Sequence, residues 1–174
     1  MGGDRGALPM FALVEKTATA LALALAVAGG VALIALLVLV CVSVTGRAVG
    51  LGPVPGDFEW VEMGVGFAVF AFLPWAQISG AHARVDLFAS LFGRTFNAVL
   101  DLVADVLMAV VACLLAWRLW LGLLDKQRYG ETTFIVQFPI WIGYAAGLIG
   151  AALFALVAMF TIWRSLRAVA RRPE

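Results

Sequence analysis

Long tracts without a charged residue constrain the fold more than any other feature of this sequence. Three of them lie between Lys16 and Arg47, from Met63 to Ala81, and from Thr132 to Trp163. A helix needs about 20 consecutive apolar residues to cross the hydrocarbon core of a bilayer. Because lipid offers no partner to a free N–H or C=O group, each tract must be helical. Each tract is therefore a candidate transmembrane helix.

A fourth apolar stretch, roughly residues 95–124, is interrupted by Asp101, Asp105 and Arg118. We interpret it as a further span. The strands of a membrane barrel would alternate polar and apolar residues, and these tracts do not. The sequence thus predicts an all-α integral membrane protein, a single membrane domain over residues 1–174. Its four transmembrane helices are expected at roughly 18–44, 60–80, 96–124 and 134–163.

Composition excludes most other classes of protein. Hydrophobic residues make up 64% of the 174 residues, charged residues only 13%, and the mean hydropathy is +1.03. A soluble domain carries about 25% charged residues. A typical cytosolic enzyme, a nucleic-acid-binding module and a disordered chain are therefore all disfavoured. The net charge of +1 gives no bulk attraction to acidic partners.

Loop charges predict the orientation in the membrane. The first tract is far longer than the 7–15 residues of a signal-peptide core, so we expect it to be retained as a span. With four spans, the side that carries both termini has eight Lys or Arg residues and the other side has three. Positive loops stay in the cytoplasm. We therefore expect both termini to be cytoplasmic and the loops near residues 47–62 and 125–133 to face outward.

Two segments between the spans have more than one interpretation. Residues 80–94 place apolar side chains near helical spacing, which suits either a short interfacial helix or the start of a longer third span. Asp57, Glu59 and Glu62 follow a turn-rich outer loop. They form either a solvated loop end or a docking surface for an outside partner.

Small residues recur at four-residue steps in two predicted helices. The first helix has Ala18, Ala22 and Ala26, and the last has Gly143, Gly147 and Ala151. Small side chains let two backbones approach closely in lipid, so these stripes are candidate helix-packing seams. An Ala-rich composition would also produce such stripes by chance.

The charged residues inside the third span are candidate intramembrane polar sites. Asp101 and Asp105 are four residues apart and share one helix face. They are either a cation- or proton-binding pair in a carrier, or structural carboxylates near the inner headgroups. Arg118 either snorkels to the outer interface or pairs with Asp125.

The residues needed for cofactor, metal or catalytic chemistry do not form a pattern. His82 is the only histidine, so a bis-histidine haem site cannot form. Cys41 and Cys113 lie inside predicted spans without metal-ligand spacing. Neither a phosphate-binding Walker loop nor a nucleophile elbow occurs. We expect no cofactor, no metal and no enzymatic activity.

Short motifs at the helix ends carry a family resemblance. The sequence GAHARVDL at residues 80–87 closes the second predicted span, and GETT at 130–133 with PxWxxY at 139–144 opens the last one. Their joint occurrence resembles the small membrane subunit (small permease, DctQ-like) of tripartite ATP-independent periplasmic (TRAP) transporters. The resemblance covers about residues 12–167.

This resemblance implies a subunit of a sodium-driven, receptor-dependent importer of organic acids in the bacterial inner membrane. In that family a large membrane subunit holds the substrate and sodium sites, and a periplasmic receptor delivers the substrate. The small subunit braces the large one and offers part of its outer surface to the receptor. Asp57, Glu59, Glu62 and Glu131 are then candidates for receptor contacts. His82, Arg84 and Asp86 are candidates for an inner-face network with another subunit or with membrane lipids.

Two other functions stay open on the sequence. One is a self-sufficient, homo-oligomeric cation-coupled carrier that uses Asp101 and Asp105. The other is a membrane anchor for an unrelated complex.

Overall fold

The computed structural model describes residues 7–79 and 94–170. It contains four helices: α1 (Ala7–Ala48), α2 (Asp57–Ile78), α3 (Arg94–Tyr129) and α4 (Ile140–Ala170). The described residues include no strand, only an isolated bridge between Thr132 and Pro139. All four helices are long and apolar enough to cross a membrane, which confirms the predicted all-α membrane class. The short interfacial helix expected near residues 80–94 falls almost entirely outside the described residues.

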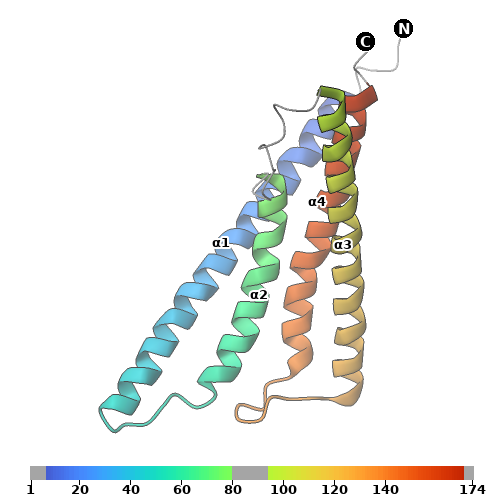
Figure 1. Ribbon diagram of the computed structural model, residues 1–174. Coiled ribbons are helices and arrows are strands. Elements are labelled where there is room, and N and C mark those ends of the chain that lie inside the picture. Colours follow the sequence, from blue (N-terminus) through green and yellow to red (C-terminus); the bar gives the residue numbers. More distant parts are fainter. Residues whose placement is uncertain (1–6, 80–93, 171–174) are drawn as a thin grey trace.

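The four helices form a row rather than a closed bundle (Figure 1). Their spatial order is α1, α2, α4, α3, so α2 and α4 occupy the centre. Over the described residues, α3 packs on α4 alone. The loops that join α1 to α2 and α3 to α4 lie at one end of the row, which we call the loop end. The start of α1 and the end of α4 lie at the opposite end.

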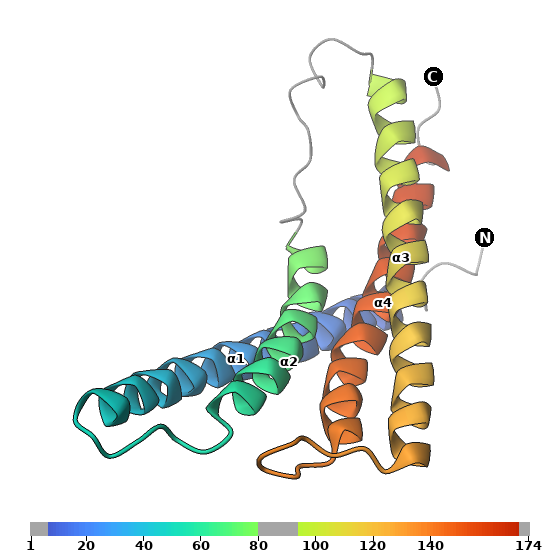
Figure 2. The ribbon, with the colours of Figure 1, turned by 60° about the horizontal axis from the view of Figure 1, so that its bottom comes forward.

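The first helix is longer than a bilayer is thick. Its 42 residues span about 63 Å at 1.5 Å per residue. A hydrophobic helix of this length must tilt or protrude. Figure 2 shows that α1 runs at a steep angle to α3 and α4. Its N-terminal part crosses the row, where Glu15 and Thr19 border a small cavity with Ile78 of α2 and Thr161 of α4.

Small side chains fill the seams between the helices. Ala22 and Ala26 of α1 are buried, as are Ala68 and Ala71 of α2. Gly29 lies so close to α2 that an added Cβ would be 3.0 Å from the Cβ of Ala71. Between α3 and α4 the buried cluster consists of three alanines and one phenylalanine, Ala109, Ala112, Ala158 and Phe154. Large aliphatic side chains point outward instead, which suits a lipid surround.

A proline allows α2 and α4 to approach closely. Pro74 lies inside α2 and has no N–H to donate to the carbonyl of Phe70 four residues earlier. This carbonyl faces Gly150 of α4, and an added Cβ on Gly150 would collide with it. Cα–H groups donate weak hydrogen bonds to carbonyls at such contacts. The fold therefore places a glycine opposite the carbonyl that the proline has released.

A buried polar pair also joins α2 and α4. The Gln77 side-chain amide donates to the Thr161 hydroxyl at 3.2 Å, and this hydroxyl donates to the carbonyl of Ala158 at 2.7 Å. Only 7% of Gln77 is exposed, and its Oε1 atom accepts no hydrogen bond from the described residues. Polar side chains between membrane helices contribute about 0.6 kcal/mol on average. The pair specifies the register of α2 against α4 more than it stabilises them.

The Gly150 contact predicts a position-specific response to added volume. Gly150→Ala should lower the free energy of unfolding by about 1–3 kcal/mol, because a methyl group would force α4 away from the Phe70 carbonyl. Gly30→Ala is the matched control, since nothing lies within 4 Å of a Cβ at that position. The control should be neutral or slightly stabilising, because alanine favours helix. Unfolding in mixed micelles, followed by tryptophan fluorescence, measures the free energy of unfolding of both variants. Equal effects of the two substitutions would contradict the close contact between Gly150 and the Phe70 carbonyl.

Candidate functional site

Polar contacts at the loop end join α1 to α2. The Arg47 guanidinium forms an ion pair with Asp57 at 2.5 Å, and the Ser43 hydroxyl donates to the same carboxylate. Ser43 also accepts the backbone N–H of Val54 at 3.2 Å. Ser43 and Arg47 are one turn apart on α1, so both face the first residue of α2. This cluster fixes the loop between the two helices.

A second carboxylate joins α2 to the loop between α3 and α4. Oε1 of Glu59 accepts the N–H of Ile135 at 2.7 Å, and Oε2 accepts the N–H of Val136 at 2.9 Å. Only 7% of Glu59 is exposed. A carboxylate so far removed from solvent needs such charge-assisted hydrogen bonds. We call this contact the Glu59 clamp, because it joins segments more than 70 residues apart in the sequence.

The loop between α3 and α4 has a defined structure of its own. Thr133 donates its N–H to the carbonyl of Phe138 at 2.9 Å and accepts the N–H of Phe138 on its hydroxyl at 3.0 Å. Lys126 and Glu131 form an ion pair at 2.6 Å where the loop leaves α3. The Trp60 and Phe138 rings are in contact, with centroids 5.5 Å apart. This loop explains why α4 begins at Ile140 rather than at residue 134.

Gly56 allows the two loops to come together. It precedes α2 with φ at 71°, a left-handed backbone conformation that glycine adopts at low cost. An added Cβ here would collide with the side chain of Val136 and lie 3.4 Å from Oε2 of Glu59. The glycine thus provides both the turn and the space for the Glu59 clamp. The tip of the α3–α4 loop stays open, with Phe134 98% exposed.

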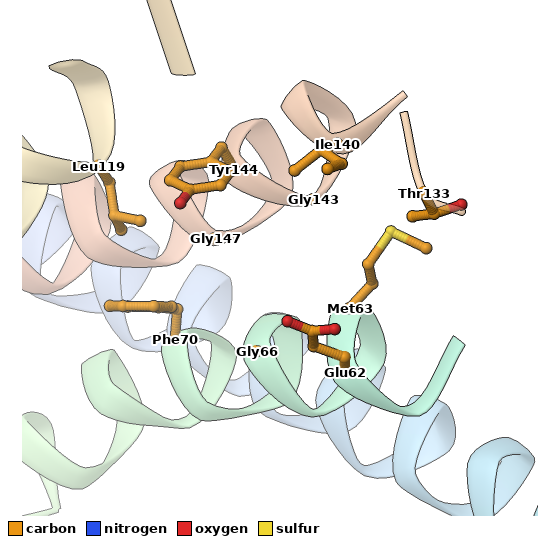
Figure 3. A pocket seen from close by; sticks show the side chains of 10 residues that line it. All are labelled: Glu62, Met63, Gly66, Phe70, Leu119, Thr133, Ile140, Gly143, Tyr144 and Gly147. Carbon is orange, nitrogen blue, oxygen red and sulfur yellow. The ribbon is translucent and has the colours of Figure 1, made fainter. Parts of the chain in front are cut away.

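A cleft lies between α2 and α4 just inside the loop end (Figure 3). Its volume is about 210 Å³, below the roughly 300–1,000 Å³ of small-molecule pockets. Glu62 reaches into it from α2, and Phe70 and Tyr144 narrow it from opposite helices. Glycines form much of its wall, which leaves both backbones accessible: Gly66, Gly143 and Gly147. We call this feature the α2–α4 cleft.

The structure separates the four acidic residues predicted to face a receptor. Asp57, Glu59 and Glu131 all make internal contacts with neighbouring loops or helices. Glu62 is exposed and, in the described part of the chain, forms neither an ion pair nor a hydrogen bond. Asp57 and Glu59 therefore hold neighbouring loops in place, and Glu131 pairs with Lys126. The carboxylate of Glu62 is the one that remains available among these four residues.

The candidate packing seam lies on α4. Gly143 faces Met63, with a would-be Cβ 3.6 Å from its Cγ, and Gly147 faces the ring of Phe70 at 3.2 Å. Ala151 is fully buried. The structure thus directs the two glycines of this stripe toward α2 of the same chain. The sequence reasoning missed Gly150, whose signal was Pro74 one turn beyond Phe70.

The remaining predicted sites are only partly described. His82, Arg84 and Asp86 lie outside the described residues, as does the side chain of Asp101. Asp105 is half-buried on α3. Arg118 is exposed, and no ion pair joins it to Asp125 in the described segments. Those segments contain no group of three His, Cys, Asp or Glu side chains able to hold a metal ion.

Comparison with known protein families gives a match over most of the chain. A family model described as "Tripartite ATP-independent periplasmic transporters, DctQ component" matches residues 36–168. The matched region begins within α1 and extends through α2 and α3 into α4. No curated protein matches the chain.

The Glu59 clamp predicts local protection in the α3–α4 loop. Glu59→Gln keeps the shape of the side chain but replaces one carboxylate oxygen by an NH₂ group, which cannot accept a backbone N–H. Amide exchange at Ile135 or Val136 should accelerate by roughly tenfold, the effect expected when a charge-assisted hydrogen bond is lost. Asp125→Asn, an exposed carboxylate on α3, is the control. Unchanged exchange at both amides would show that the loop holds its shape without the clamp.

Proposed function

This chain belongs to the DctQ component family of tripartite ATP-independent periplasmic transporters and is a small, multi-pass membrane component, and we propose that it braces the large membrane subunit. The family match over residues 36–168 carries this proposal. A transporter made of several components needs surfaces on which they assemble. In the bracing role, the exposed helix faces of this chain are the surfaces that contact the large subunit.

The outward faces of the row support a role in assembly. Because α3 packs on no described helix except α4, most of its circumference is free to meet lipid or another protein. Trp117 and Trp120 on α3 are 58% and 50% exposed. Tryptophan is enriched in the cores of protein interfaces and also at membrane–water boundaries. A rigid, apolar helix edge of this kind suits a brace.

We further propose that the complete transporter is a sodium-driven importer of organic acids in the bacterial inner membrane. A periplasmic receptor would deliver the substrate and contact the loop end. Both termini would be cytoplasmic, as the loop charges predict. The contacts that Asp57 and Glu59 make with the loops support this placement, because a docking surface whose loops are held by such contacts loses less conformational entropy on binding.

Co-purification tests the bracing role. A tagged copy of this chain should recover the large membrane subunit in stable stoichiometric amounts from detergent extracts, because their apolar faces cover each other. A tagged unrelated four-span protein from the same membrane is the control. Recovery of this chain only with itself would contradict the proposal.

Cysteine labelling tests the orientation. In a background with Cys41 and Cys113 replaced by serine, Leu51→Cys at the loop end should react with a membrane-impermeant maleimide in intact cells whose outer membrane is permeable to it. Leu51 is 87% exposed, so access is not limiting. Leu166→Cys, near the opposite end of the row, should react only after the inner membrane is opened. The reverse pattern would place the termini outside.

A further inference from the structure

We propose that the α2–α4 cleft receives a single basic side chain, lysine or arginine, from a transmembrane helix of the large subunit, with Glu62 as its counter-ion. This proposal rests on the proposed assembly with a large membrane subunit and names one point of contact. Three observations carry it: the available carboxylate, the size of the cleft, and the glycines around it.

The first observation is the unused charge. Glu62 lies within α2, past its first turn, and its carboxylate points toward α4 (Figure 3). Unlike Asp57, Glu59 and Glu131, it has no partner in the described residues. None of the residues that line the cleft is Lys, Arg or His. A carboxylate that lines a mainly apolar cleft without a cation of its own chain favours a basic partner.

The second observation is the size and lining of the cleft. At about 210 Å³ it is too small for a transported acid together with its ions, but it can accept one long side chain. Its walls are mainly apolar and include Met63, Phe70 and Leu119. Lysine and arginine combine an apolar stem with a charged end, so the stem would pack on these walls while the charge meets Glu62.

The third observation concerns access. Gly66 is exposed on α2, and nothing lies within 4 Å of the position of its missing Cβ. Glycines on the surface of a membrane helix let a second helix approach closely. The space over Gly66 therefore admits a partner helix near enough to insert a side chain. Gly147 and Gly150, in contrast, already face Phe70 of the same chain.

The dissociation rate of the complex tests the counter-ion role. The full chain and the large subunit are purified together, and exchange of the tagged chain against untagged copies is followed. Glu62→Gln should accelerate dissociation by roughly tenfold, since it leaves a buried cation without its partner. Asp125→Asn removes a carboxylate of α3 that also lies near the loop end, and it should leave the dissociation rate unchanged. Equal rates for Glu62→Gln and the wild type would overturn the proposal.

A steric pair tests the cleft independently of charge. Gly66→Leu fills the cleft from α2, and nothing lies within 4 Å of the Cβ that it adds, so it should accelerate dissociation to a similar extent. Gly30→Leu, on α1, where nothing lies within 4 Å of the added Cβ either, should not. Both variants are first checked for unchanged insertion and helicity. An unaffected Gly66→Leu complex would also overturn the proposal.

A photoreactive amino acid at position 66 distinguishes the possible occupants. We expect crosslinks to a large-subunit peptide adjacent to a Lys or Arg residue, and none of these from position 30. Crosslinks to lipid alone would overturn the proposal in favour of an amine-bearing headgroup. Failure of the wild-type chain to recover any large subunit would overturn the proposed function itself. If the wild-type chain recovers the large subunit but the Glu62→Gln and Gly66→Leu variants dissociate at the wild-type rate, only this contact is rejected.

Discussion

Close approach of helix backbones in lipid is the constraint on which the rest of this structure depends. Between apolar helices in a bilayer, burial of hydrophobic surface supplies little driving force, so packing and weak polar contacts must hold the row together. The α2–α4 seam combines both. Pro74 releases the carbonyl of Phe70, Gly150 leaves space for that carbonyl, and Gln77 with Thr161 adds one hydrogen bond. The α2–α4 pair therefore positions the loops and the carboxylates at the loop end.

The loop end uses its carboxylates mainly to hold itself together. Asp57 ties α2 to Arg47 of α1, and Glu59 ties α2 to the loop before α4. Both residues belong to the first turn of α2, the central helix that contacts α1 and α4. Glu62, one turn further along, is left for another molecule. A rigid loop end with one available carboxylate is what we expect of a component that assembles with others.

Much of the fold could be predicted from the sequence, because the lengths of apolar tracts depend only on the thickness of the bilayer. The helix order in space could not, since the tracts of α1 and α4 are similarly apolar and neither identifies its neighbour. The acidic cluster at 57–62 was visible, but whether a carboxylate meets solvent or a backbone N–H depends on a loop more than 70 residues away. Gly150 could have been found by asking which carbonyl Pro74 leaves without a partner. Gly143, Gly147 and Ala151 were identified from spacing, but spacing alone does not say that the two glycines face α2.

The central claim is that this chain is a brace for a larger transport subunit and does not itself conduct ions or solute. Proteoliposomes that contain this chain alone test it most directly, with uptake of radiolabelled sodium and acidification of a trapped dye measured against protein-free vesicles. The account predicts no flux of either cation above the protein-free background. Cation flux through the isolated chain that disappears in Asp105→Asn would contradict it and would establish a self-sufficient carrier.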